Sequence, residues 1–146
     1  MRPGEKSVTE KIVFELSDLH IEQLHALYQH EWWTKGRTLE ATRRVVQGSQ
    51  VVIALLDGDD RIVGFVRVLS DYTFKALIFD VIVAAHARHL GLGSRLISLV
   101  TDHPALRDVR HFELYCLPEL VSFYGAHGFS DEVGNIRLMR RVTPSA

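Results

Sequence analysis

Hydrophobic residues form two kinds of pattern along the chain. Nearly continuous apolar runs indicate buried strands, and apolar residues spaced three or four positions apart indicate amphipathic helices. Together these patterns predict the element order β-α-α-β-β-β-α-β-α-β. The predicted strands cover residues 11–17, 50–56, 61–71, 73–85, 109–116 and 135–142, and the predicted helices cover 19–33, 39–46, 92–100 and 118–127.

Two connections indicate how the strands pair. The four residues 57–60, Asp-Gly-Asp-Asp, have the composition of a hairpin turn, which requires antiparallel pairing of the flanking strands. The helix predicted at 92–100 joins two strands, and such a βαβ unit requires parallel pairing. The predicted fold class is therefore α/β (α+β), a mixed sheet with helices on its faces.

Length and charge exclude several classes of protein. The 146 residues fit one domain over 1–146, and the apolar and charged shares of 47% and 24% are those of ordinary globular domains. The net charge of −1 provides no global field toward nucleic acid or an anionic membrane. We therefore expect neither as a partner.

Targeting signals are also missing from the sequence pattern. The first eleven residues are polar and lack the apolar core of a secretory signal, so we expect a cytoplasmic protein. The longest apolar run, 76–85, contains an aspartate and is shorter than the about 20 residues of a membrane helix. The single cysteine, Cys116, allows no intrachain disulfide.

The segment His86–Leu96, HARHLGLGSRL, lies between a predicted strand and a predicted helix. Gly91 and Gly93 leave room for backbone amides to approach a ligand, and the helix N-terminus favours an anion there. A tight turn would explain two glycines equally well. A Rossmann fingerprint fits poorly, because position 96 is leucine, and no P-loop string occurs.

The remaining pattern, R-x-x-G-x-G from Arg88, resembles the acyl-CoA pyrophosphate loop of the GCN5-related N-acetyltransferase (GNAT) family. Downstream, "FYGAHGF" has Tyr124 four residues before a Gly-Phe pair, which resembles the family's LYxxxGF. The element order resembles the family over nearly the whole chain, and "WWTKGR" and "FDVIV" resemble a bacterial subgroup of small, mostly uncharacterised members. His89 and Leu117 depart from the frequent glycine and asparagine at their positions.

The resemblance implies a mostly antiparallel sheet with one central parallel pair, around 79–83 and 112–116, that splays apart. Main-chain groups of the first strand would bind pantetheine like an added strand, and the amide of Val81 or Val83 would polarise the acetyl carbonyl. The diphosphate would lie on the glycine loop. The implied cofactor-binding residues are Val81, Ile82, Val83, Arg88, His89, Leu90, Gly91, Leu92, Gly93, Ser94 and Tyr124.

The implied activity is direct transfer of an acetyl group from acetyl-CoA to a primary amine of a small molecule or peptide, without a metal. The family also makes a homodimer an expectation. The first alternative is a non-catalytic acyl-CoA-binding sensor of the same fold. Two further alternatives stay open, a thiol hydrolase centred on Cys116 and an interaction protein without a small ligand.

Tyr124 is the expected general acid. A phenol with a pKa of about 10 is protonated at neutral pH and can donate to a departing thiolate whose conjugate acid has a pKa near 8.5. The competing interpretation is a core aromatic on the helix at 118–127.

Asp80 is a candidate for the general base, directly or through water. It stands alone in an apolar strand, and burial would raise its pKa. The competing interpretation is an ion-pair partner for an arginine such as Arg67.

The segment between the first two helices is expected to cover the acceptor side, with Tyr28 and Trp33 in the acceptor pocket. Trp32 follows the apolar helix face and is expected in the core. Lys35 and Arg37 are expected to be solvated charges, with recognition of an acidic group as the alternative.

The eight histidines and the cysteine suggest no metal site. His20, His25 and His30 are five residues apart, a spacing that turns successive helical side chains to different faces. No HExxH motif or Cys/His cluster occurs. We expect Cys116 to be an inert core residue at the end of an apolar strand.

Overall fold

A computed structural model describes residues 11–145. The strands are β1 (Lys11–Val13), β2 (Val51–Leu56), β3 (Ile62–Ser70), β4 (Lys75–Val83) and β5 (His111–Leu114). The helices are α1 (Asp18–Tyr28), α2 (Leu39–Gln47), α3 (Leu92–Thr101) and α4 (Val121–Gly125), with short 3-10 turns at Ala85–Ala87, Pro104–Leu106 and Pro118–Leu120. The polar N-terminal stretch lies outside the described residues except for Lys11.

The chain separates into two compact units, Met1–Tyr115 and Cys116–Ala146. The first unit holds all five strands and the helices α1, α2 and α3. The second holds the turn Pro118–Leu120, the helix α4 and the segment that follows it.

The five strands form one sheet in the order β1-β2-β3-β4-β5. The first three pairings are antiparallel, and β4 pairs with β5 in parallel, because the chain returns to the same edge through α3. Two irregularities interrupt the ladders, one between β2 and β3 and one between β3 and β4. The predicted mixed, mostly antiparallel sheet is confirmed.

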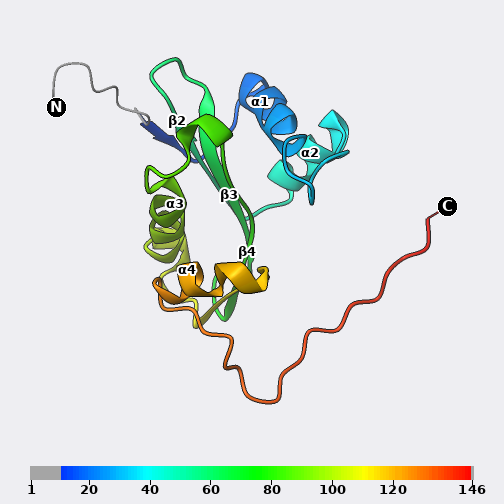
Figure 1. Cartoon of the computed structure of the whole chain (residues 1–146), viewed down its shortest axis with the longest axis vertical. Coiled ribbons are helices and arrows are strands. Elements are labelled where there is room, and N and C mark those ends of the chain that lie inside the picture. The colour runs from blue at the N-terminus through cyan, green and yellow to red at the C-terminus, as the bar shows by residue number, and fades with distance from the viewer. Residues whose placement is uncertain (1–10, 146) are drawn as a thin grey trace, which may run out of the picture. The chain divides into compact units, whose positions relative to one another are not determined.

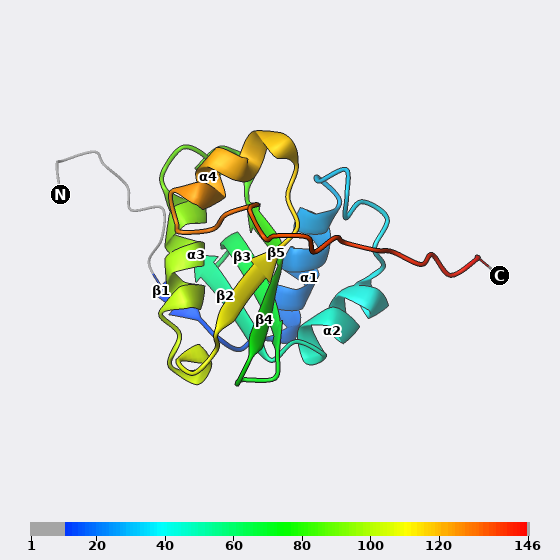
Figure 2. The same ribbon diagram turned by 90° about the horizontal axis from the view of Figure 1, so that it is seen from below.

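Helices cover both faces of the sheet in the first unit. Figures 1 and 2 show α3 on one face and α1 with α2 on the other. The α1 face contains a buried cluster in which Leu24 and Tyr28 pack on Val52, Phe65 and Ile82 of the sheet. Burial of this apolar cluster stabilises the position of α1, because hydrophobic burial is the main favourable term in folding.

Local end signals account for the helix boundaries. Ser17 accepts from the amide of His20 and begins α1, and Thr38 accepts from the amide of Ala41 and begins α2. Gly48 ends α2 as predicted.

Helix α1 is shorter than the predicted 19–33 and ends at Tyr28. The Thr34 hydroxyl donates to the Tyr28 carbonyl at 2.7 Å, so this carbonyl is satisfied by a turn and not by a further turn of helix. Trp32 therefore leaves the apolar helix face and is 74% exposed, so its expected place in the core is wrong.

The predicted terminal strands differ from the observed ones for one physical reason. The first strand covers only Lys11–Val13, where it pairs with β2. Residues 135–142 form no strand within the part of the chain that is described, and Ile136, Leu138 and Met139 are exposed there. A strand exists only where its backbone groups find a ladder partner, and an apolar sequence pattern does not supply one.

Candidate active site

Strand β4 carries a β-bulge at Asp80. Phe65 of β3 lies opposite Ile82, and Arg67 lies opposite Phe79, so the two residues Asp80 and Val81 oppose a single residue of β3. Asp80 has the left-handed φ of 57° that a bulge of this kind demands. The bulge therefore sets the direction of the Asp80 side chain, which is 3% exposed.

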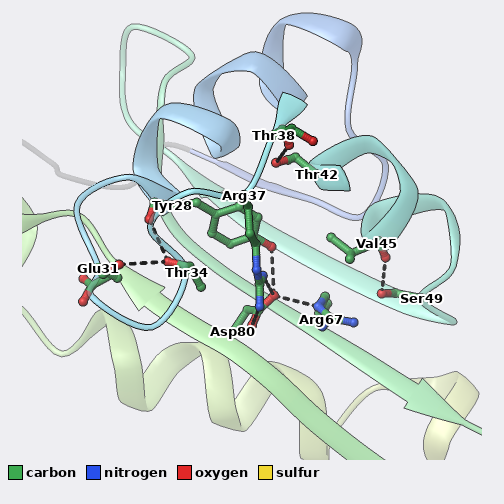
Figure 3. A network of polar contacts seen from close by, with 10 residues as sticks. All are labelled: Tyr28, Glu31, Thr34, Arg37, Thr38, Thr42, Val45, Ser49, Arg67 and Asp80. Carbon is green, nitrogen blue, oxygen red and sulfur yellow. Dashed lines mark hydrogen bonds and ion pairs between the residues drawn. The ribbon is translucent and has the colours of Figure 1, made fainter. Parts of the chain in front are cut away.

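Three donors from three elements converge on Asp80. Arg37 donates from Nη1 to Oδ2 at 2.7 Å and from Nη2 to Oδ1 at 3.4 Å, Arg67 donates from Nε to Oδ2 at 2.7 Å, and the Tyr28 hydroxyl donates to Oδ2 at 2.9 Å. Figure 3 shows the Arg37 and Arg67 side chains reaching Asp80 from different directions, Arg37 from above and Arg67 from the right. We call Tyr28, Arg37, Arg67 and Asp80 the Asp80 network.

The charge state of Asp80 follows from these contacts. Burial alone would raise the pKa of Asp80, but the hydrogen bonds and positive charges of Arg37 and Arg67 hold it below its ordinary value. The expected rise in the pKa of Asp80 is therefore wrong, whereas the alternative interpretation, an ion pair with Arg67, is confirmed. Arg37, expected to be solvated, is likewise paired with Asp80.

Tyr28 supports this network from the core. Its ring is fully buried and packs edge-on against Phe65, with the Arg37 guanidinium 4.7 Å from its centre. Burial, then the charge and hydrogen bond of Asp80, raise the pKa of Tyr28 far above its ordinary value. Since Tyr28 has no exposed surface, the expectation that it lines an acceptor pocket is corrected.

Beyond the bulge, the parallel strands part. β5 pairs with β4 only from Lys75–His111 to Ile78–Leu114, while β4 continues to Val83. Where the pairing ends, the rings of Phe79 and Tyr115 meet edge to face at 5.8 Å. Residues 79–83 of β4 therefore have no β5 partner. Val81, Ile82 and Val83, the predicted pantetheine contacts, lie in this stretch.

The glycine loop follows directly. His89 and Gly91 have φ of 65° and 78°, and Gly91 is the N-cap of α3. A left-handed φ is strained for a residue with a side chain, which explains the glycine at position 91. The histidine at position 89 adopts the same conformation at that cost.

The loop presents backbone donors. Among residues 11–145, the amides of His89, Leu90, Gly91, Leu92 and Gly93 donate to no backbone or side-chain acceptor. Ser94 follows in the first turn of α3. A helix N-terminus with unpaired amides is an anion-binding arrangement.

Arg88 is engaged by another segment. Its Nη2 donates to Glu31 Oε1 at 2.7 Å, and its Nε donates to the Val83 carbonyl at 3.3 Å. Both side chains of the ion pair retain exposed surface, 49% for Arg88 and 19% for Glu31. Glu31 was not predicted, because nothing in the local sequence connects the α1–α2 segment with the glycine loop.

The α1–α2 segment also carries the remaining acceptor-side residue. Trp33 is 40% exposed, and its predicted role in an acceptor pocket stays a prediction. Gln29 holds the segment in shape, since its amide donates to the Arg37 carbonyl and accepts from the amide of Gly36. Surface hollows lined by Phe14 and His103 contain none of the predicted site residues.

Tyr124 belongs to the second unit, on α4. Its ring is in contact with Phe123 and Phe129. Burial, and to a lesser degree the neighbouring Cys116, raise the pKa of Tyr124. The phenol is therefore protonated throughout the physiological pH range. Its catalytic role stays a prediction.

Cys116 is exposed, so its expected place in the core is wrong. The strand β5 ends two residues earlier, at Leu114, so the cysteine is not part of the strand.

Metal-binding clusters and membrane-spanning helices are both absent from residues 11–145. No group of three or more His, Cys, Asp or Glu side chains is placed to hold a metal ion. No helix in this part of the chain is long and apolar enough to cross a membrane.

Comparison with known proteins agrees with this geometry. The model of the acetyltransferase (GNAT) family matches residues 13–129, so the chain belongs to that family. Its members are acyltransferases, and this chain is one of them.

Individual relatives share about a third of their residues with this chain or fewer. The uncharacterized N-acetyltransferase ycf52 of Pyropia yezoensis is 28% identical over 125 residues, which cover 84% of this chain and 71% of the relative. The crystal structure of a protein assigned to the GNAT family from Xanthomonas campestris has a TM-score of 0.79 and 30% identity, covering 92% of this chain and 93% of the other. An aminoglycoside 6'-N-acetyltransferase complexed with coenzyme A shares the fold alone, at 19% identity and a TM-score of 0.62 over 71% of this chain and 60% of the other.

Proposed function

We propose that this protein transfers an acetyl group from acetyl-CoA directly to a primary amine of a small molecule or peptide. The observation that carries the proposal is the end of the β4–β5 pairing at Ile78–Leu114, followed by β4 residues without a β5 partner and by loop amides at 89–93 without an acceptor among residues 11–145. An extended chain pairs with an open strand edge, and a diphosphate suits the amides at a helix N-terminus. Coenzyme A contains both groups in series.

In this proposal the main chain of Val81, Ile82 and Val83 holds the pantetheine arm. The amide of Val81 or Val83 donates to the thioester carbonyl, where negative charge develops as the amine attacks. The carbon–nitrogen bond forms and the carbon–sulfur bond breaks, and the departing thiolate takes a proton from Tyr124. The acceptor amine releases its own proton to water, and the Tyr124 phenolate takes a proton back from water, so that the net products are the amide and the free thiol. Residues 88–94 hold the diphosphate, with Arg88 released from Glu31.

We assign Asp80 a positioning role rather than the role of base. A carboxylate that two arginines hold ionised has a low pKa and takes up a proton poorly at neutral pH. Its contacts instead tie the α1–α2 segment, through Arg37 and Tyr28, to the bulge that precedes Val81. Trp33 on that segment is the proposed acceptor contact. Cytoplasmic localisation and a homodimer remain predictions from the sequence and the family.

The test is release of free thiol from acetyl-CoA across a panel of primary amines. We expect thiol release that depends on the amine, together with formation of the acetylated amine detected by mass spectrometry. Arg88→Ala should weaken coenzyme A binding, and Arg107→Ala, which removes an exposed charge beyond the other end of α3, should leave it unchanged.

The alternatives give different results in the same assay. A non-catalytic acyl-CoA sensor would bind coenzyme A and release no thiol with any amine. A thiol hydrolase would lose its activity in Cys116→Ser, whereas the proposed transferase keeps it, and an interaction protein would show no thermal shift with acetyl-CoA.

A further inference from the structure

The Asp80 network contains more positive charge than negative charge. Arg37 and Arg67 contribute two positive charges, and within residues 11–145 Asp80 is the one carboxylate paired with either of them. Glu31 is paired with Arg88, and Glu113 is paired with Lys75 at 2.7 Å, so these neighbouring acids are committed elsewhere. Within the described part of the chain, one positive charge of the network therefore has no acidic partner.

Arg67 also has N–H donors that the Asp80 network does not use. Arg67 has a side chain that is 12% exposed, and of its five N–H groups only Nε–H has an acceptor among the described residues. Figure 3 shows the far end of its guanidinium directed away from Asp80. A buried guanidinium is ordinarily paired and hydrogen-bonded, because burying charged donors without acceptors is costly. The Nη side of Arg67 is therefore ready for an anionic oxygen pair.

The geometry of Arg67 is also held in place. Its guanidinium lies over the ring of Phe79 at 5.0 Å, and its Nε is anchored on Asp80 at 2.7 Å. With one edge anchored and one face stacked, the opposite edge presents two donors in the flat fork that matches a carboxylate. Arg37, with a side chain 28% exposed, gives the network an opening to solvent.

The Arg67 guanidinium lies beside the part of β4 that carries the proposed chemistry. Asp80 directly precedes Val81 in the bulge, and the exposed ring of Tyr115 against Phe79 adds an apolar surface beside it. We infer that Arg67, supported by Arg37, binds a carboxylate group of the acceptor, so that the preferred acceptor is an amine that also carries a carboxylate, such as an amino acid. This inference rests on the proposed function and adds the acceptor class to it.

Product binding tests the inference without requiring turnover. The protein saturated with coenzyme A is titrated in a calorimeter with N-acetyl-phenylalanine and with N-acetyl-phenylalaninamide, which lacks the negative charge. The aromatic side chain suits the Phe79–Tyr115 surface. We expect the acid to bind at least about tenfold more tightly than the amide, as a bidentate arginine–carboxylate pair would give. Equal affinities, or no binding of either compound, would overturn the inference.

Variants locate the effect. Arg67→Gln should abolish the preference for the acid, and Arg67→Lys should keep part of it. Arg61→Gln, at an exposed arginine just before the same strand, should keep all of it. A preference that survives Arg67→Gln in the folded protein, as checked by circular dichroism, would overturn the assignment. If no amine releases thiol while the acid still binds preferentially, the proposed transfer fails and the carboxylate site stands.

Discussion

Arg88 donates to Glu31 across 2.7 Å, although the two residues are 57 positions apart in the chain. The guanidinium proposed for the diphosphate thus pairs with a carboxylate of the α1–α2 segment. A diphosphate arriving at the glycine loop has to compete with Glu31 for Arg88. This ion pair connects the α1–α2 segment with the glycine loop, and coenzyme A binding would break it.

Glu31→Gln should tighten coenzyme A binding. The substitution removes the negative charge that competes for Arg88 and that repels the diphosphate. Exposed ion pairs of this kind are weak, so the dissociation constant of coenzyme A should fall about two- to fivefold. The dissociation constant measured by calorimetry at low salt checks this. Glu40→Gln, an exposed acid in the first turn of α2, is the control and should change nothing. Weaker binding in Glu31→Gln would contradict competition.

Gly91→Ala should reduce both stability and cofactor affinity. A Cβ at position 91 meets no atom within 4 Å, so the cost comes from the left-handed φ of 78° and amounts to about 1 kcal/mol. Chemical unfolding and calorimetry measure the two effects. Gly134→Ala, at a φ of 72° with similar open space, should carry the backbone strain without the loss of coenzyme A affinity. Equal affinity of both variants for coenzyme A would remove the loop from the binding site.

Asp80→Asn should lower the free energy of unfolding by about 3 kcal/mol at neutral pH, because it leaves two arginines without their carboxylate. The folded-state pKa of Asp80 is lowered, so its contribution is complete above the unfolded pKa of about 3.9 and is lost as the pH falls toward the folded value. Urea unfolding from pH 7 to pH 3 should show a constant difference between wild type and variant above about pH 5. Below about pH 4 the difference should shrink. A difference that grows in acid would mean that the pKa is raised instead.

Tyr124→Phe should lower turnover about 100-fold if the phenol supplies the proton to the thiolate. The dissociation constant of coenzyme A should stay unchanged, because the ring is retained. Steady-state kinetics and calorimetry separate the two quantities, and Tyr72→Phe, with an exposed ring in the β3–β4 turn, is the matched control. Since burial raises the pKa of Tyr124, any fall in rate between pH 8 and pH 9 should be identical in Tyr124→Phe and in the wild type. Normal turnover in the variant would exclude Tyr124 as the acid.

Features with short-range causes could be predicted from the sequence. The caps at Ser17 and Thr38, the hairpin turn at 57–60 and the helix after the glycine loop each depend on residues a few positions apart. The R-x-x-G-x-G string marked the loop whose amides at 89–93 have no acceptor among residues 11–145. Asp80 stood out as a charge in an apolar strand, and an arginine was a foreseeable partner because a buried carboxylate needs one. The register itself puts Arg67 opposite Phe79, and the bulge brings Asp80 to it.

The sequence by itself thus determined the element order as far as the last helix, the mixed sheet and the place of the loop, since local backbone preferences and hydrophobic periodicity govern these. Only the tertiary structure decided that α1 ends at Tyr28, that residues 135–142 form no strand, and that Arg37 joins Asp80 across 43 positions. It also decided the ionisation of Asp80, which burial and two positive charges push in opposite directions. Such outcomes depend on which distant groups meet, and on the balance of desolvation against pairing there, which no local pattern contains.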